Sequence, residues 1–152
     1  MITIGIELNY VLRDINKQII KYYSKEFDPS IDIDEIDATS DVLKDVCKFE
    51  SKHARNSFLY IDYPYEIFGC ANTAEKKLST KMTSWLSEIE NIEDEDIRIV
   101  FYSLNEEALT IQSTYFFLSK IGTRVRKVFF PKDISEIWSE CDIAVTANKD
   151  VV

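Results

Sequence analysis

Hydrophobic residues recur with two different periods along the chain, one typical of strands and the other of helices. Residues 2–8 alternate large apolar side chains with small ones, which predicts a short buried strand. Three later segments, residues 97–102, 125–130 and 142–146, are dense in β-forming residues and predict three more strands.

Helical spacing of apolar residues accounts for much of the remaining chain. A first helix is predicted from the N-cap Asp14 to Phe27, and Pro29 closes it. Two more helices are predicted from apolar positions at the same spacing: residues 42–49 behind a cap at Thr39 or Ser40, and residues 78–89 behind the capping pair Asn72 and Glu75.

The aromatic segment 58–69 has neither period. It contains Pro64 and ends in Gly69, so we expect an ordered loop or a broken helix there and not a central strand.

Helices also separate the last three strands. Ser103 and Glu106 have the spacing of a capping box and open a helix that Gly122 ends, while Asp133 and Glu136 open a short helix before the last strand. Alternation of this kind requires crossover connections, which predict a parallel sheet with helices on its faces. We therefore predict one α/β domain over residues 1–152, with a mostly helical insertion over about 14–92.

Composition excludes several classes of protein. The chain is 45% hydrophobic and 30% charged, as in ordinary globular proteins, and its 18 basic and 27 acidic residues give a net charge of −9. An overall negative field disfavours nucleic acid and anionic lipid as partners, and no apolar run approaches the roughly 20 residues of a membrane span.

Few residues are available for the common motifs of cofactor and metal binding. The three glycines are too scattered for a dinucleotide or P-loop motif, and His53 is the single histidine. Cys47, Cys70 and Cys141 form no C-x-x-C pair. An odd number of separated cysteines and a start unlike a signal peptide predict a cytoplasmic protein.

Ligands of open parallel sheets bind at the carboxyl ends of the strands, where this chain has four polar segments. They are residues 7–11, Ser103, Lys132 and residues 146–148. This layout resembles the haloacid dehalogenase superfamily of phosphatases, and most closely its small nucleotidase-like members. The resemblance implies a three-layer Rossmann-like domain, a strand order 4-1-2-3, and a C1-type helical cap between the first and second motifs.

The chain departs from that family at the positions that carry its chemistry. By the resemblance, Glu7 stands at the aspartate nucleophile, Asn9 at the general acid and base, and Thr146 with Ala147 at the acidic metal-binding pair. The longer Glu7 misplaces the nucleophile, and an amide cannot exchange the proton, which costs about 100-fold or more in each case. We expect a catalytically inactive domain with no cofactor and no metal site. The alternative is a phosphatase acting on a small phosphomonoester such as a nucleotide, with Glu7 as nucleophile and Mg²⁺ bound.

Each candidate also has a structural interpretation. Ser103 is equally explained as a helix N-cap, Lys132 as a surface lysine, and His53 and Cys70 as surface or packing residues. Glu7 is harder to dismiss because a carboxylate at the end of a buried strand needs a partner, for which Arg13 or Lys132 is expected.

Two features point to partner proteins. Arg124 and Arg126 alternate along the third predicted strand, in contrast to acidic tracts at 28–50 and 88–96, and this division of charge suits assembly with other subunits. Five aromatic residues are candidates for an interface or for packing of the cap: Phe58, Tyr60, Tyr63, Tyr65 and Phe68. Degenerate domains of this kind also resemble ones encoded by tailed bacteriophages, which implies a structural role in a virion or tail assembly.

Overall fold

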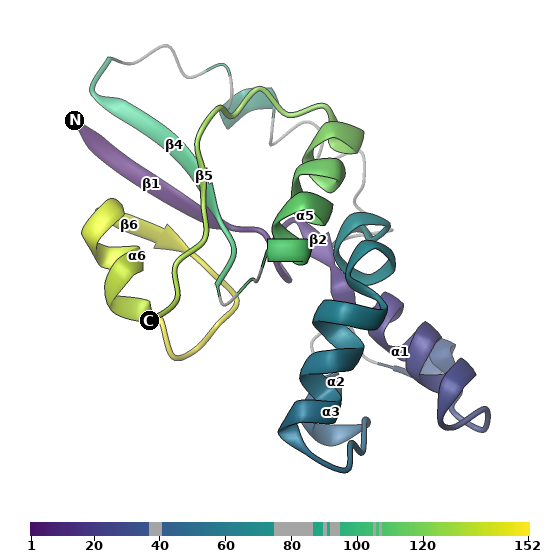
Figure 1. The fold of residues 1–152 in the computed structure, drawn as a ribbon. Helices are drawn as coiled ribbons and strands as arrows, with labels where there is room; N and C mark the ends of the chain where they lie inside the picture. Colours follow the sequence, from purple (N-terminus) through teal and green to yellow (C-terminus); the bar gives the residue numbers. More distant parts are fainter. Residues whose placement is uncertain (37–40, 75–86, 90, 92–94, 105, 107) are drawn as a thin grey trace. The chain divides into compact units, whose positions relative to one another are not determined.

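The computed structural model describes residues 1–36, 41–74, 87–89, 91, 95–104, 106 and 108–152 (Figure 1). The chain divides into two compact units. Unit 1 comprises Met1–Arg13, Thr73–Glu106 and Leu118–Val152, and unit 2 comprises Asp14–Asn72 and Glu107–Phe117. The single-domain architecture with a cap over about 14–92 stays a prediction.

Unit 1 contains a four-stranded parallel sheet, which confirms the α/β class. Its strands are β1 (Ile2–Glu7), β4 (Ile97–Tyr102), β5 (Val128–Phe129) and β6 (Ile143–Val145). The order is β5-β4-β1-β6, with all three pairings parallel, so the strands lie in the predicted order (Figure 1). Glu7 pairs with Tyr102 and Ile2 with Ile97 in the central register.

Two helix ends in this part of the chain follow the predicted capping chemistry. The short helix α6 (Ile134–Glu140) begins at Asp133, whose carboxylate accepts the N–H of Glu136 at 3.1 Å. Helix α5 (Ala108–Ile121) ends immediately before Gly122, which has a φ of +66° that a glycine adopts without a steric penalty. Ile137 of α6 packs in a buried cluster with Tyr102 and Val151.

Unit 2 is helical and has its own core. Helix α1 (Ile15–Glu26) begins at the predicted N-cap Asp14, whose carboxylate accepts the N–H of Lys17. The other elements are η1 (Ile33–Glu35), α2 (Val42–Asp45), α3 (Lys52–Ser57), and the π-helical turns η2 (Phe58–Asp62) and η3 (Tyr65–Gly69). The core joins α1 to the π-helical turns through Ile19, Ile20, Phe58 and Ile67, each at most 1% exposed.

The aromatic segment is therefore a broken helix, as predicted, with the break between η2 and η3 at Tyr63 and Pro64. The sequence did not predict helix α3, nor the separate two-stranded sheet of β2 (Arg13–Asp14) and β3 (Asn72–Thr73).

Two predicted elements are shorter than expected. The third strand covers only Val128–Phe129, because the N–H of Val125 donates to the Thr123 hydroxyl at 3.1 Å and so joins a local turn instead of the ladder. Helix α2 ends at Asp45 and not at 49, and its N-cap is Asp41. The expected caps Thr39 and Ser40, and most of the helix expected over 78–89, lie outside the described residues.

Gly5 is required by a close contact inside unit 1. A Cβ atom at this position would lie 2.5 Å from the Sγ atom of Cys141 and 3.3 Å from the Tyr102 ring. Cys141 is 5% exposed and Tyr102 is fully buried, so neither side chain can move aside without disturbing the core.

We predict that Gly5→Ala lowers the free energy of unfolding by about 1–3 kcal/mol through overpacking, and that Cys141→Ala in the same chain recovers part of the loss. Gly122→Ala is the matched control, since its Cβ meets nothing within 4 Å. Its cost of about 1–2 kcal/mol comes from the positive φ alone, and Cys141→Ala should leave it unchanged. Urea unfolding followed by circular dichroism measures all four variants. If Cys141→Ala recovered the same amount of stability in Gly5→Ala and in Gly122→Ala, the close contact between residue 5 and Cys141 would not be the cause of the loss.

Candidate functional site

A buried arginine joins two of the predicted site positions at the carboxyl edge of the sheet. The guanidinium of Arg13 donates to the Oδ1 atom of Asn9 from Nε at 2.9 Å and from Nη2 at 2.7 Å. The same Nη2 lies 2.6 Å from Oε1 of Glu106 and 3.3 Å from the Ser103 hydroxyl. The Arg13 side chain is 0% exposed and that of Glu106 is 1% exposed.

Further hydrogen bonds close this network. The Ser103 hydroxyl donates to Oε1 of Glu106 at 2.6 Å, and the Asn9 amide Nδ2 donates to the Ser103 hydroxyl at 3.3 Å. Asn9 and Ser103 are thus bonded to each other and to the ion pair. We call these four residues, Asn9, Arg13, Ser103 and Glu106, the arginine network.

A tight turn after β1 brings Arg13 back to Asn9. The N–H groups of Leu12 and Arg13 both donate to the carbonyl of Leu8, at 3.0 and 2.8 Å. Tyr10 takes a φ of 67°, which is uncommon for a bulky residue, and its N–H donates to the Arg13 carbonyl at 2.8 Å. The turn therefore brings the Arg13 guanidinium back to the side chain of Asn9, which lies four residues earlier in the sequence.

The energetic cost of burying the Arg13 cation is offset by its partners in the arginine network. Desolvation lowers the pKa of Arg13, and the Glu106 carboxylate opposes this shift by its charge and its hydrogen bond. Arg13 pairs with Glu106 and not with Glu7, which corrects the partner expected from the sequence.

Glu7 is held by the loop that follows β6. Its carboxylate accepts a short hydrogen bond from the Thr146 hydroxyl, which in turn accepts the N–H of Asn148 at 2.9 Å. Burial raises the pKa of Glu7, and hydrogen bonds from Thr146 and from the backbone of Ala147 and Asn148 oppose the rise. Glu7 is 5% exposed, and its carboxylate is already a multiple acceptor.

Tyr102 packs close to Glu7 in the sheet. The two residues are register partners, and the Tyr102 ring lies against Gly5 beside Cys141. Burial raises the pKa of Tyr102 to about 12, and the nearby Glu7 carboxylate contributes to the rise. The phenol therefore stays protonated at neutral pH.

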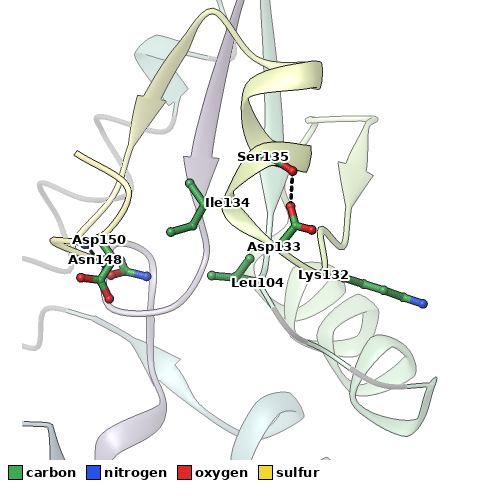
Figure 2. Close-up of a pocket in the computed structure, with 7 residues that line it drawn as sticks. All are labelled: Leu104, Lys132, Asp133, Ile134, Ser135, Asn148 and Asp150. Atoms are coloured by element: carbon green, nitrogen blue, oxygen red, sulfur yellow. Dashed lines mark hydrogen bonds between the residues drawn. The ribbon is translucent and has the colours of Figure 1, made fainter.

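Lys132 stands apart from both groups. It is exposed, and its backbone N–H donates to Oε2 of Glu136 at 2.8 Å. Figure 2 shows its side chain extending away from Leu104 and Asn148, which line the same pocket. This pocket has a volume of about 560 Å³, and its described lining includes Asp133, Ile134, Ser135 and Asp150 but none of Glu7, Asn9, Ser103 or Thr146.

The structure thus brings the predicted positions into two separate groups. Asn9 and Ser103 belong to the arginine network, Glu7 and Thr146 form a second pair, and Lys132 joins neither. Ser103 lies five residues before the first residue of α5, so it is not adjacent to the helix that it was expected to cap. Sequence reasoning missed Glu106 as a site residue and the pairing of Arg13 with it, although the capping-box spacing had singled out Glu106.

The aromatic candidates belong to unit 2. Phe58 and Phe68 are 1% and 4% exposed, so they are core residues. Tyr63 lies between Tyr22 and Phe58, with ring centroids 4.9 and 5.1 Å away. Tyr60 is half-buried and stacks on Phe68, while Tyr65 is exposed and contacts Phe116. Their part in an interface stays a prediction.

The other candidates are distributed over both units. Arg124 and Arg126 are exposed, and they lie in the segment before β5 and not on a strand, which corrects their expected alternation. His53 is exposed on α3. All three cysteines are free thiols, and burial raises the pKa of Cys47 to about 12.

The donor atoms at the carboxyl edge fit a hard cation poorly. Mg²⁺ prefers anionic oxygen ligands, and Glu7 already accepts from a hydroxyl and backbone N–H groups. Among the described residues, no group of three or more His, Cys, Asp or Glu is arranged to hold a metal ion.

Two findings concern the molecule as a whole. Within the ranges that the structure describes, no helix is long and apolar enough to cross a membrane. Compared with known proteins, the chain matches no family model, no curated protein and no solved structure. The resemblance to the haloacid dehalogenase superfamily therefore stays a prediction from the sequence.

We predict that Glu106→Gln lowers the free energy of unfolding by about 3–5 kcal/mol, because it leaves the buried Arg13 cation without its counter-charge. Glu140→Gln is the matched control: Glu140 lies at the same 2.6 Å from Lys127, but the two side chains are 43% and 42% exposed. Its cost should be much smaller, because solvent screens an exposed ion pair. Urea unfolding measures both, and equal losses would show that burial does not set the strength of the Arg13 pair.

A second prediction concerns pH. The pKa of Glu7 is raised above its ordinary 4.5, so protonation favours the folded state, and this stability is lost as the pH rises through the folded pKa. The stability of the native chain relative to Glu7→Gln should therefore fall as the pH increases from 4.5. Lys127 lowers the pKa of Glu140, so the stability of the native chain relative to Glu140→Gln should show the opposite trend and fall as the pH decreases below 4.5. Unfolding by urea across a pH series tests both signs, and a flat difference for Glu7→Gln would contradict the first.

Proposed function

We propose that the chain is a catalytically inactive α/β module of haloacid dehalogenase ancestry that acts through binding to other proteins. The observation that carries this proposal is the arginine network. In-line phosphoryl transfer needs a nucleophile, an acid and a phosphate ligand that converge on one substrate. Here the amide of Asn9 and the hydroxyl of Ser103 are both bonded within the protein, around a buried guanidinium.

The position of Glu7 supports the same proposal. Its carboxylate faces Thr146 and the loop after β6, and that hydroxyl and two backbone N–H groups already donate to it. An attacking carboxylate would have to leave these donors, and burial, which raises the pKa of Glu7, favours the protonated form that cannot attack. A nucleophile held in this way adds to the disadvantage of the extra methylene.

The proposed partner is a protein surface. The net charge of −9 disfavours polyanions over most of the surface, whereas exposed arginines before β5 provide a local site of opposite charge. Assembly into a virion or tail, suggested by the resemblance to phage-encoded domains, is the form of partnership that we propose for the whole chain.

We predict no magnesium-stimulated hydrolysis of an aryl phosphate above that of Glu7→Ala. Restoring the first motif with Glu7→Asp and Asn9→Asp should also give no turnover, because the carboxylate introduced by Asn9→Asp would form an ion pair with Arg13 and the acidic metal ligands would still be missing. A chain that carries Thr146→Asp and Ala147→Asp in addition to these two changes tests whether the missing metal ligands are what prevents turnover. Steady-state assays with and without magnesium measure each chain. Magnesium-dependent turnover by the native chain that Glu7→Ala abolishes would establish the phosphatase instead.

A further inference from the structure

A basic groove in unit 1 is lined by β4, by the segment that precedes β5 and by Ile89. Its volume is about 320 Å³, at the lower end of the range for ligand pockets. The cations that line it are Arg98, Arg124, Arg126 and Lys127, and Ile97 and Ile99 contribute apolar surface. No acidic residue is among the described residues of the lining, although the chain is acidic overall.

Residues from both faces of β4 line this groove, which places it along the edge of the strand. Side chains of a strand alternate between the two faces, so Arg98 lies on one face and Ile97 and Ile99 on the other. Arg98 donates to the Thr3 hydroxyl at 3.3 Å on its own face, as expected for register partners. A cavity reached from both faces can only follow the strand edge.

In the described part of the chain, that edge has no partner strand along the first half of β4. On one side β1 pairs with the whole strand, from Ile97 to Tyr102, but on the other side β5 pairs only with Phe101 and Tyr102. In the part of the chain that the structure describes, no strand pairs with Ile97 or Ile99 on the β5 side.

The backbone of Ile97 and Ile99 faces this open side. Alternate residues of a strand direct their N–H and C=O groups to the same side. The N–H groups of Phe101 and Ser103 donate toward β5, to the carbonyls of Lys127 at 3.0 Å and Phe129 at 3.2 Å. Ile99 and Ile97 continue this alternation toward the amino end, so they present donors and acceptors to the groove.

The opposite wall is fixed by local hydrogen bonds. The Thr123 hydroxyl accepts the N–H of Val125, which draws this segment out of the ladder, and the Phe101 to Lys127 bond closes the groove at one end. Lys127 is also 2.6 Å from Glu140, a carboxylate that interacts with Arg98 as well. The guanidinium groups of Arg98, Arg124 and Arg126 add positive charge to the lining of the groove.

We propose that this groove binds an acidic segment of a partner protein in extended conformation, added as a strand to the open edge of β4. Backbone groups of Ile97 and Ile99 pair with the segment, its carboxylates lie against Arg98, Arg124 and Arg126, and its apolar side chains contact the isoleucines. Charge complementarity selects an acidic occupant, and the open strand edge selects a polypeptide over a simple anion. This inference rests on the proposed interaction function and names its site and partner chemistry.

The test uses a fluorescent peptide of alternating Glu and Val and measures binding to the full chain by anisotropy at low and high salt. Arg124→Glu with Arg126→Glu should weaken binding at least about tenfold at low salt, and less at high salt. Lys25→Glu with Lys44→Glu makes the same change of charge at exposed positions of unit 2 and should alter the affinity by less than about twofold. A peptide with Lys in place of Glu should not bind.

Backbone pairing has its own readout. Of two acidic peptides methylated at alternate backbone nitrogens, only the one whose methyl groups face β4 should lose binding. Saturation with the unmodified peptide should slow hydrogen exchange of the Ile99 amide by about tenfold or more, and leave that of buried Val100 unchanged, since Val100 faces β1.

Three results would overturn the proposal. The first is no binding of the acidic peptide. The second is equal binding of both methylated peptides together with displacement by inorganic phosphate, which would identify a site for simple anions. The third is self-association of the chain that the arginine substitutions abolish, without any peptide binding, which would assign the groove to a second copy. Each leaves the absence of phosphatase activity untouched, whereas turnover on an aryl phosphate would refute the proposed function and not the groove.

Discussion

The buried pair of Arg13 and Glu106 constrains the carboxyl edge of the sheet more than any other interaction that the structure describes. A guanidinium with no exposed surface is tolerated only if its charge and its donors are matched, because an unpaired buried cation costs several kcal/mol. Glu106 supplies the charge, and Asn9 and Ser103 add hydrogen bonds. The turn after β1 and the end of β4 are thereby joined by polar contacts between residues about ninety positions apart in sequence.

This constraint determines what remains for a ligand. In an open parallel sheet, ligands bind to polar groups at the carboxyl ends of the strands. Here Asn9 and Ser103 are hydrogen-bonded to the Arg13 guanidinium, and Glu7 is hydrogen-bonded to the loop after β6. The nearby pocket includes Lys132 and Asn148 in its lining but none of Glu7, Asn9, Ser103 or Thr146, and the Lys132 side chain extends away from Leu104 and Asn148 (Figure 2). Proximity of the four motif positions in the topology therefore leaves their side chains in two different hydrogen-bonded groups, with Lys132 in neither.

The sequence predicted those features that local chemistry determines. The caps Asp14 and Asp133, the end at Gly122, and the four parallel strands follow from spacing over a few residues and from the alternation of elements. The partner of Arg13 depends on the path of a tight turn with Tyr10 at positive φ, which no periodicity reveals. The short β5 likewise results from one hydroxyl, that of Thr123, competing with the ladder. Side-chain networks between distant segments and competition for single N–H groups thus lie beyond pattern reasoning.

Charge at the edge of β4 has a simpler explanation that the geometry argues against. Edge strands are commonly protected from aggregation by a charged side chain on the strand itself, and Arg98 alone would serve that purpose. The additional cations Arg124 and Arg126 stand on the facing segment, across a cavity with isoleucine in its lining and backbone groups at its side. Protection requires that the edge be covered or that it repel another strand, whereas among the described residues no strand pairs with Ile97 or Ile99 on this side and cations line the groove beside them. An acidic strand would pair with the backbone of β4, neutralise the cations and cover the isoleucines. Protection of the edge alone does not require these three features in one place.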